Sequence, residues 1–507
     1  MDCHTCTTGR GIRPGYGLIL AALLFSLFTL SPLNARAQTP AGEWTAPVRI
    51  AEGGTFPSLA VDSSGRLHVM WTANMSGREI AGWGDTLLYA YSDGDVWSVP
   101  TDVLAVQAGE TAESPDLMVG TDGNLHVIWR HDTELLHSWA PLSEARRPQS
   151  WHTSYAIASV PPGSRPCHAT TDDQGAFHVV CARQTEEGWG LIYLRSDVGG
   201  LTWHGPLAVR EADREHGVDL PRLAIDADGG IHVTWTESRL PDGWPLLGVF
   251  YSRSVDGGQT WSASTQLATD QQGYSTIATT QTGHIHVVWN SSAFGRHHRW
   301  SEDGGRTWSD DILVSAAAGT TQGAPAIAID SASAVHVIMF DSPAGLDRAD
   351  DIRYSSWDGA TWTPLRLLSE GETGVYVAFP AAVISEGNRL HGVWCNLATS
   401  EHPTPNLEQN SPGIWYVKLE TAAPRMSPTI NEVLKPTPVE PMDALVSGPE
   451  TPTVQAALPQ STALPVTSVT QSATASDSSL VTLAGPLTAA VVVLTVVAAQ
   501  LNRKKGR

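Results

Sequence analysis

The sequence predicts an all-β protein, a seven-bladed β-propeller built from four-stranded antiparallel blades. An element of the form His-Val-x-Trp, with some variation after the histidine, recurs at intervals of 50 to 58 residues. A period near 50 residues with four short strands per repeat is typical of a propeller blade. A string of β-sandwich domains, the other all-β interpretation, needs roughly 100 residues per unit. The seven copies have their histidines at His68, His126, His178, His232, His286, His336 and His391.

The clearest repeat unit spans residues 220–270. Apolar and polar residues alternate at 223–226, and β-branched and aromatic residues follow at 231–235 after a short turn. Two more strand patterns, 248–254 and 261–268, are separated by a turn rich in Gly and Asp. Each unit therefore predicts one antiparallel sheet with tight turns.

The last repeat predicts only three strands, of which the final one spans residues 413–420. Near the other end of the chain, the segment 44–51 (WTAPVRIA) matches the fourth strands of other repeats but has no repeat of its own. We therefore expect this N-terminal strand to complete the seventh blade and to close a propeller domain of residues 38–420, leaving no open edge in the ring.

Composition excludes one class of partner. The chain has 507 residues, and 31 Lys and Arg against 52 Asp and Glu give it a net charge of −21. Nucleic-acid binding needs a basic stripe, and the sequence has none. We expect no nucleic-acid partner.

The first 37 residues have the pattern of a signal peptide. Arg10 and Arg13 precede an apolar run at 18–30, and a small-residue site follows at 35–37. The alternative is an uncleaved anchor, although the run is shorter than the about 20 residues that a membrane span needs. Cleavage would leave an exported protein that begins at Gln38.

The C-terminal part of the chain predicts a stalk and an anchor. Residues 421–479 are rich in Pro, Thr, Ser, Ala and Val, a composition that favours a disordered, extended stalk. Residues 480–501 are apolar and 502–507 are basic, which predicts a transmembrane helix with a cytoplasmic C-terminus and a head at the cell surface. The alternative is a sorting signal, because LPVTS at 464–468 is similar to the motif that sortases cleave, although Ser468 replaces the expected Gly.

The seven repeated histidines raise the possibility of a metal site. One histidine at the same strand position of each blade lies on a ring around the axis, whereas zinc ligands must converge to about 2.0–2.1 Å from one centre. A core group hydrogen-bonded to a neighbouring strand is the simpler interpretation. We expect neither a metal nor another cofactor.

The five cysteines divide into two groups. Cys3 and Cys6 lie in the leader and have no second ligand pair, so a metal site there is not expected. Cys167 and Cys181 stand at matching positions on the first two strands of blade three, which predicts a disulfide bond in an exported protein and leaves Cys395 free. Two buried thiols are the alternative.

Two turns carry a specific motif. SVDGGQTW at 254–261 and SEDGGRTW at 301–308 follow the pattern Ser-x-Asp-x-Gly-x-Thr-Trp, and blade three has Val198 where the Asp is expected. These turns resemble those of the Asp-box (BNR repeat) propellers, a family that includes sialidases, and the resemblance covers about residues 44–420. It implies a structural turn between third and fourth strands, made here by Ser254, Asp256, Gly258, Thr260, Trp261, Ser301, Asp303, Gly305, Thr307, Trp308 and, in a shortened copy, Asp358.

The resemblance also implies where a sialidase site would lie. It places the site on the face opposite the Asp boxes, with three arginines for the substrate carboxylate, a Tyr nucleophile paired with a Glu, and an Asp acid/base. This chain departs from that plan: Thr55-Phe56-Pro57 stands where an Arg-Ile-Pro element should open the first blade, and seven blades exceed the six usual in sialidases.

The loops that enter each first strand and leave each second strand build that face. They supply Arg130, Arg165, Arg183, Arg222, Arg239 and Asp341 as candidate ligand-binding residues, with His131 and Asn290 nearby. Bidentate pairing of arginine with carboxylate gives the chemical reason. If the protein is an enzyme, the candidate nucleophile is Tyr274 and the candidate acid/base groups are Glu237 and Asp132. The alternative is a rim of charged residues paired among themselves.

Two functions from different classes follow. The first is a surface-displayed module that binds a glycan or another extracellular polymer, which the stalk, the anchor and the loop aromatics Trp83, Trp189 and Trp244 favour. The second is a sialidase-type exo-glycosidase with a rearranged site. We expect the binding module, acting as a monomer.

Overall fold

In the computed structural model the chain divides into two units, Met1–Thr39 and Pro40–Arg507. The predicted signal peptide, transmembrane helix and basic tail lie outside the described residues, as does the predicted stalk beyond Met426. No helix in the described part of the chain is long and apolar enough to cross a membrane. The structure describes residues 42–77, 84–107, 109–160, 167–243, 245–269, 271–291, 295–316, 323–341, 351–369, 375–398 and 412–426.

The described residues form seven antiparallel sheets, which confirms the predicted fold class. In the first sheet the outer strand is split in two by a segment ending at Pro100, because proline cannot donate to the ladder. The sheets, each in spatial order, are β2 (Thr55–Val61), β3 (Leu67–Ala73), β4 (Thr86–Asp93), β5 (Val96–Trp97) with β6 (Thr101–Ala105); β7 (Ala112–Val119), β8 (Asn124–His131), β9 (Glu134–Pro141), β10 (Tyr155–Ser159); β11 (Cys167–Thr171), β12 (Phe177–Thr185), β13 (Gly188–Ser196), β14 (Trp203–Asp213); β15 (His216–Ile225), β16 (Ile231–Arg239), β17 (Leu246–Ser254), β18 (Thr265–Ala268); β19 (Gln272–Thr279), β20 (Ile285–Ser291), β21 (Gly295–Ser301), β22 (Ile312–Ala316); β23 (Ala326–Ile329), β24 (Val335–Asp341), β25 (Asp351–Trp357), β26 (Arg366–Ser369); and β27 (Val375–Ser385), β28 (Arg389–Ala398), β29 (Gly413–Glu420) with β1 (Val48–Ala51).

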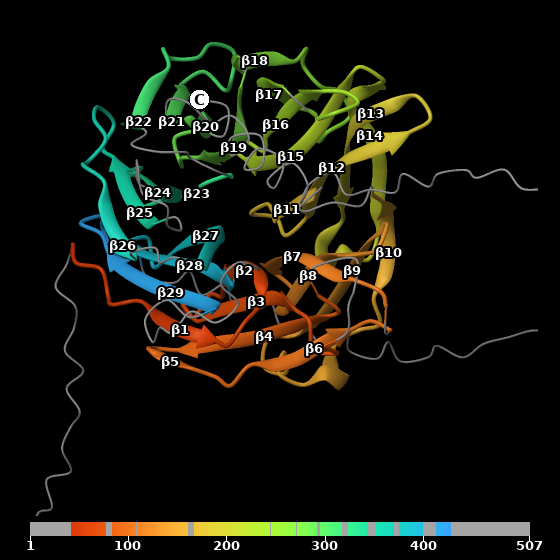
Figure 1. Ribbon diagram of the computed structural model, residues 1–507, viewed down its shortest axis with the longest axis vertical. Helices are drawn as coiled ribbons and strands as arrows, with labels where there is room; N and C mark the ends of the chain where they lie inside the picture. Colours follow the sequence, from red (N-terminus) through yellow and green to blue (C-terminus); the bar gives the residue numbers. More distant parts are fainter. Residues whose placement is uncertain are drawn as a thin grey trace, which may run out of the picture. The chain divides into compact units, whose positions relative to one another are not determined.

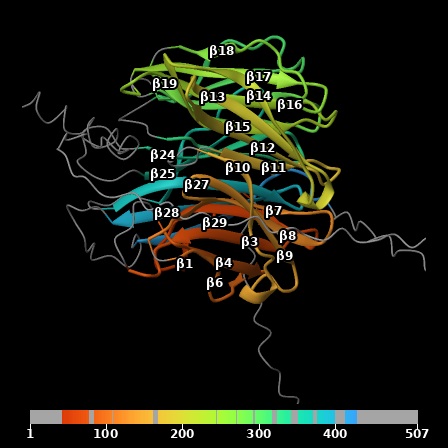
Figure 2. The same cartoon turned by 90° about the vertical axis from the view of Figure 1, so that its right-hand side faces the viewer.

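The sheets are the blades of a ring. The first strand of each blade lies nearest the centre (Figure 1), and consecutive first strands contact one another, including β27 and β2 across the closure. Figure 2 shows the same blades from the side. Each blade buries its two apolar faces against its neighbours, which is how small sheets that cannot stand alone become stable.

The N-terminal strand closes the ring, as predicted. Strand β1 pairs antiparallel with β29, with Val48 opposite Tyr416. Just before the strand, the backbone N–H of Gly42 donates to the carbonyl of Glu420 at 2.8 Å. Ile50 is buried in the core cluster that joins the first and last blades. Blade seven therefore combines the two ends of the propeller domain.

A buried hydrogen-bond relay explains the repeated histidines. In four blades the histidine Nδ1 pairs with a Tyr hydroxyl of the third strand at 2.6–2.8 Å, and its Nε2 pairs with an Asp of the first turn at 2.9–3.3 Å. The Asp also accepts backbone N–H groups of its own turn, so the relay fixes the turn and the two strands together. These relays are Asp62–His68–Tyr89, Asp172–His178–Tyr193, Asp226–His232–Tyr251 and Asp330–His336–Tyr354.

The other blades keep the histidine and change its partners. In blade seven, Ser385 replaces the Asp and bonds His391, which also bonds Tyr416. In blades two and five a second histidine replaces the Tyr, giving His126–His137 and His286–His298. Burial lowers the pKa of His391 to about 3 and of His286 to about 4, so these histidines are neutral near pH 7.

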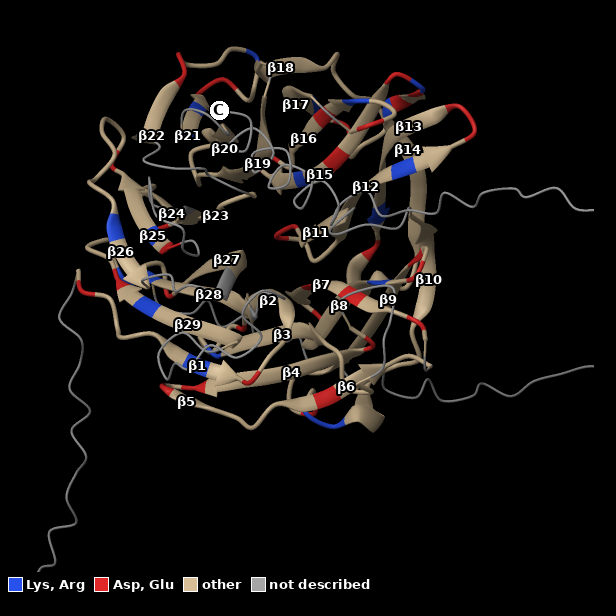
Figure 3. Cartoon of the chain, viewed as in Figure 1, with Lys and Arg blue, Asp and Glu red and all other residues tan. Residues whose placement is uncertain are grey.

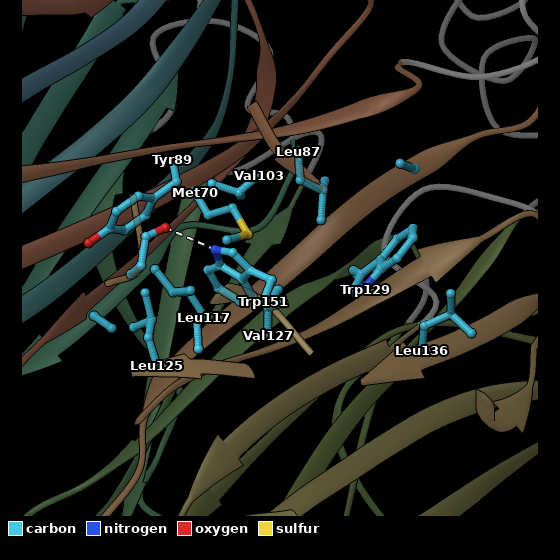
Figure 4. Packing of buried hydrophobic residues seen from close by; sticks show 14 residues of the cluster. Met70, Leu87, Tyr89, Val103, Leu117, Leu125, Val127, Trp129, Leu136 and Trp151 are labelled. Atoms are coloured by element: carbon cyan, nitrogen blue, oxygen red, sulfur yellow. Dashed lines mark hydrogen bonds between the residues drawn. The ribbon is translucent and has the colours of Figure 1, made fainter. Parts of the chain in front are cut away.

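A tryptophan from the next blade caps each relay at its edge. In six junctions the indole meets the Tyr or His ring in a T-shaped contact, with centroids 4.9–5.8 Å apart and planes at 69–84°. In the seventh junction, Trp151 of blade two packs in the core cluster of Tyr89, and its indole N–H donates to Ala145 O at 2.9 Å (Figure 4). The six other caps are Trp44, Trp97, Trp203, Trp261, Trp308 and Trp362.

Complete Asp-box turns hold two of these tryptophans, Trp261 and Trp308. Asp256 accepts the backbone N–H of Thr260 at 2.9 Å, and its other oxygen accepts the Thr260 hydroxyl at 2.5 Å. Gly258 has a φ of +87°, and a Cβ there would overlap the ring of Tyr193 in the preceding blade. The fifth blade repeats the arrangement with Asp303 and with Gly305 against Tyr251, and Asp358 accepts two backbone N–H groups in its shortened turn.

In blade three, Cys167 and Cys181 are register partners on β11 and β12, and they form a disulfide bond. Cys395 is buried and forms no disulfide bond among the described residues, and its thiol donates to the carbonyl of Ala378 at 3.3 Å. The blade keeps a turn in place of its degenerate Asp box, the short 3-10 helix η2 (Val198–Gly200).

The chain that follows β29 crosses the end of the ring that carries the Asp-box turns. Thr421 donates its hydroxyl to Asp330 at 3.0 Å, and Ser331 donates to the carbonyl of Pro424 at 2.5 Å. Arg425 pairs with Glu386. We call residues 421–426 the C-terminal strap, since they tie β29 to the turns of blades six and seven.

Removing β1 tests the closure. A chain that begins at Gly53 loses the β1–β29 hydrogen bonds and the burial of Ile50, and leaves β29 as an open edge. We expect at least about 3 kcal/mol of destabilisation of the whole ring. Thermal unfolding followed by circular dichroism measures it, with a chain that begins at Gly42 as the control. Equal melting temperatures for the two chains would contradict closure by this strand.

Removing one hydroxyl tests the relay. Tyr251→Phe leaves Nδ1 of buried His232 without its partner, and we expect a loss of about 1–3 kcal/mol in the free energy of unfolding. The control is Tyr91→Phe, since the Tyr91 ring is half-buried and lies outside the relay. Denaturant titration measures both, and equal losses would show that the hydroxyl of Tyr251 is not special.

Candidate functional site

The two ends of the ring differ in what they carry. The turns between first and second strands and those between third and fourth strands lie at one end, with the relays, and we call it the Asp-box face. The loops that enter first strands and leave second strands lie at the other end, which we call the mouth face. The predicted ligand-binding and catalytic residues that the structure describes belong to strands or loops at the mouth face.

A repeated strained bend shapes the mouth face. In five blades the first strand has a bulge, and a non-glycine residue in the bulge has a φ between +46° and +57°. Left-handed backbone at such residues costs energy, and bulges of this kind re-aim side chains and are common beside functional sites. These residues are Phe56, Ser114, Leu220, Tyr274 and Phe379.

Asp219, beside one of these bends, is the most perturbed carboxyl of the mouth. Burial raises its pKa to about 6, although the backbone N–H of Leu220, at 2.8 Å, and the charge of Arg222 act in the opposite direction. Its side chain nevertheless reaches solvent.

Tyr274 lies on the neighbouring first strand and interacts with this carboxyl. Burial raises the pKa of Tyr274, and the negative charge of Asp219 raises it further. Its backbone N–H donates to the hydroxyl of Thr236 at 2.7 Å, and Thr236 is the strand partner of Asp219. The phenol is therefore held protonated, as a hydrogen-bond donor, and not as a ready nucleophile.

Arg222 completes this group below the mouth. It is buried, and its Nη1 donates to the carbonyl of Pro221 at 2.8 Å. It lines a cavity of about 320 Å³ that the first strands of blades three to six enclose, with His168 on the wall. Asp219, Arg222 and Tyr274 thus form one cluster at the mouth of the central channel, which we call the mouth cluster.

In blade two, the predicted residues Arg130 and Asp132 are bonded to nearby residues of the protein itself. Arg130 is buried and pairs with buried Glu113, its strand partner, while a second nitrogen donates to the carbonyl of Asp132 at 2.7 Å. The Asp132 carboxylate accepts both the backbone N–H and the hydroxyl of Thr111, at 3.1 and 3.0 Å. Both side chains are thus engaged with partners of blade two and its adjoining loops.

Glu237 is also engaged. It accepts the indole N–H of Trp235 at 2.9 Å and pairs with Nε of Arg210 at 2.7 Å. Arg210 belongs to β14, so this largely buried pair joins blade three to blade four. Removing one partner of such a pair costs about 3–5 kcal/mol, because the other charge is left buried. Figure 3 shows how the basic and acidic positions are distributed over the described part of the chain.

Other predicted residues lie at strand ends of the mouth face or outside the described part of the chain. Arg183 and Arg239 are exposed at the ends of β12 and β16, and Trp189 is half-buried. Asp341 ends β24. Arg165, Trp83 and Trp244 lie outside the described residues.

The structure adds site residues that sequence reasoning missed. They are Asp219 in the mouth cluster, the buried partners Glu113 and Arg210, and Arg296, whose guanidinium donates to Gly323 O at 2.5 Å and Phe340 O at 2.9 Å. Arg296 thereby joins blades five and six at the mouth face. Within the described ranges, no group of three or more His, Cys, Asp or Glu is arranged to hold a metal ion.

Comparison with known proteins identifies the fold. No protein-family model and no curated protein matches the sequence. Among solved structures, an ulvan lyase of polysaccharide lyase family PL25 is 10% identical with a TM-score of 0.51, covering 74% of this chain and 95% of that one. The BP39L lectin of Burkholderia pseudomallei is 13% identical with a TM-score of 0.51, covering 75% and 99%. A Trypanosoma rangeli sialidase is 11% identical with a TM-score of 0.40, covering 74% and 56%, which is too low to support an argument. At these identities the likeness is one of fold: the chain is a propeller similar in architecture to proteins that include a lyase and a lectin.

Proposed function

We propose that this propeller is a glycan-binding module whose ligand contacts the mouth cluster. The observation that carries the proposal is Asp219, a solvent-accessible carboxyl that the surrounding protein perturbs, next to the protonated phenol of Tyr274. A carboxyl acceptor beside a phenol donor suits the hydroxyl groups of a sugar. Arg183 and Arg239 on the rim extend the contact to further residues of a chain.

The partners of the predicted acid/base groups, and the raised pKa of the predicted nucleophile, favour binding over catalysis. Asp132 is bound to Thr111, Glu237 is paired with Arg210, and the pKa of Tyr274 is raised. A sialidase-type mechanism needs a Tyr that loses its proton to a nearby base and a separate acid/base, and these side chains have other partners.

One observation favours a hydrolase as the second candidate. A carboxyl with a pKa near 6 is suited to act as a general acid near neutral pH. Asp219 would then replace Asp132 as the acid/base of an exo-glycosidase. Turnover of a fluorogenic sialoside by the protein distinguishes this candidate from a binding module.

We further propose that the head is displayed at a cell surface. The support is compositional: an export signal at 1–37, a Pro/Thr/Ser-rich stalk up to residue 479, and an apolar run followed by a basic tail at 480–507. Fractionation of cells that express the full chain, with protease treatment of intact cells, tests this placement.

Substitutions in the mouth cluster test the binding site. We expect Asp219→Asn and Tyr274→Phe each to weaken binding of an array-identified glycan by roughly 2- to 10-fold, since a lost hydrogen bond costs about 0.5–1.5 kcal/mol. Calorimetric titration measures the affinity. The control is Asp228→Asn, an exposed aspartate of the same blade at the Asp-box face. Unchanged affinity in both mouth variants would move the site elsewhere, and loss of sialoside turnover in Tyr274→Phe would support the enzyme.

The pKa of Asp219 predicts how binding depends on pH. The carboxylate accepts stronger hydrogen bonds from sugar hydroxyls than the neutral acid does. Affinity for a neutral glycan should therefore rise as the pH increases from 5 to 7, with a midpoint near the pKa of about 6. In Asp219→Asn the profile should be flat over this interval. A wild-type profile as flat as that of the variant would remove Asp219 from the site.

A further inference from the structure

The junction between blades six and seven lacks an element that covers other junctions. In blades four and five the turn after the third strand lays a glycine against the Tyr of the preceding relay. In blade seven, the third strand is β29 and the outer strand is β1, so no turn joins them. Trp44 still caps Tyr354 at its edge, with centroids 5.0 Å apart, but the ring is not covered by a glycine turn.

The uncovered relay borders a cavity. Tyr354 is 8% exposed, whereas Tyr193 and Tyr251 under their Asp-box turns are each 1% exposed. Tyr89, which Trp151 and its cluster cover instead of an Asp-box turn, is also 1% exposed. The cavity at the sixth junction has a volume of about 470 Å³, and its lining includes Asp330, His336, Tyr354, Ser356, Thr363 and Arg366.

We propose that this cavity is a second binding site, for one neutral sugar ring. Its volume falls within the range of small-ligand pockets, which combine apolar and aromatic walls with a few polar groups. The Tyr354 ring and Leu419 supply the apolar part. The polar part includes the hydroxyls of Ser356 and Thr363, which lie 3.3 Å apart, and the Thr363 hydroxyl also accepts the Ser356 backbone N–H at 2.9 Å. The site lies on the Asp-box face, at the opposite end of the ring from the mouth cluster, and does not depend on it.

The charges at the cavity favour a neutral ligand over an ionic one. The Asp330 carboxylate already accepts His336 Nε2, the Thr421 hydroxyl and the backbone N–H groups of Ala332 and Ala334, all at 3.0 Å. Burial alone would raise the pKa of Asp330, but these hydrogen bonds lower it, so the group is ionised. Exposed Arg366 balances that charge, and only its Nη1 is used by the carbonyl of Gly42, at 3.0 Å, among the contacts described. The guanidinium has further N–H donors that suit a sugar hydroxyl.

Saturation-transfer NMR of the full-length protein tests the site. The probes are six free sugars: glucose, galactose, mannose, fucose, N-acetylglucosamine and N-acetylgalactosamine. We expect at least one to receive saturation from the wild-type protein. Ala422→Trp and Ala332→Trp, which place a large side chain in the cavity without altering the relay, should abolish that signal, and Arg366→Ala should weaken it at least 3-fold.

Matched variants make the outcomes distinct. Ala360→Trp adds the same bulk at an exposed turn of the same face, outside the cavity, and should leave the signal intact. Asp219→Asn should also leave it intact, since that residue belongs to the mouth cluster. Melting temperatures verify that each variant folds. The proposal is overturned if no sugar receives saturation or if the signal persists in both filled variants. A signal lost only in Asp219→Asn would overturn this site while supporting the mouth cluster.

Discussion

A buried histidine, hydrogen-bonded through both ring nitrogens in six of the seven blades, fixes the geometry of the repeat. In blade four, His232 joins Asp226 at the first turn to Tyr251 on the third strand, and Trp308 of the next blade caps the tyrosine. The same buried group therefore specifies strand register within one blade and the packing of the next blade. An unsatisfied buried nitrogen costs about 1–3 kcal/mol, which favours substitutes that keep both bonds, such as Ser385 in blade seven and His137 in blade two.

At the mouth face, several arginines are bonded to other residues of the ring. Arginines there are drawn into the ring: Arg130 pairs with Glu113, Arg210 with Glu237, and Arg296 bonds carbonyls across a junction. Two of these three, Arg210 and Arg296, join neighbouring blades, and Arg130 acts within blade two. The Asp219 carboxyl and the Tyr274 phenol lie at strained bends of the inner strands, and Arg183 and Arg239 are exposed on the rim.

The fold could be predicted because it repeats. Seven spaced copies of one pattern gave the blade count, the stray segment 44–51 predicted the closure, and facing positions placed Cys167 opposite Cys181. The site was harder to predict from the sequence, because the ion pairs of its side chains do not follow the repeat. Nothing near Arg130 in the sequence indicates that Glu113, 17 residues earlier, neutralises it.

Asp219 is a second residue whose environment could not be predicted from the sequence. An acidic residue two positions before a proline occurs at Glu113-Ser114-Pro115 and again at Asp219-Leu220-Pro221. That shared pattern could have directed attention to the entry of the first strands. The different fates of the two acids depend on a nearby arginine, which only the folded ring reveals.

The C-terminal strap has a mechanical consequence. A force applied to the chain beyond Met426 first meets the contacts of Thr421, Ser331 and Glu386 at the Asp-box face, and only then β29. The strap spreads that load over the turns of blades six and seven, so the pairing of β1 with β29 is shielded from direct traction. The seam of the ring, where both ends of the propeller meet, is thus protected at the place where a tether would pull.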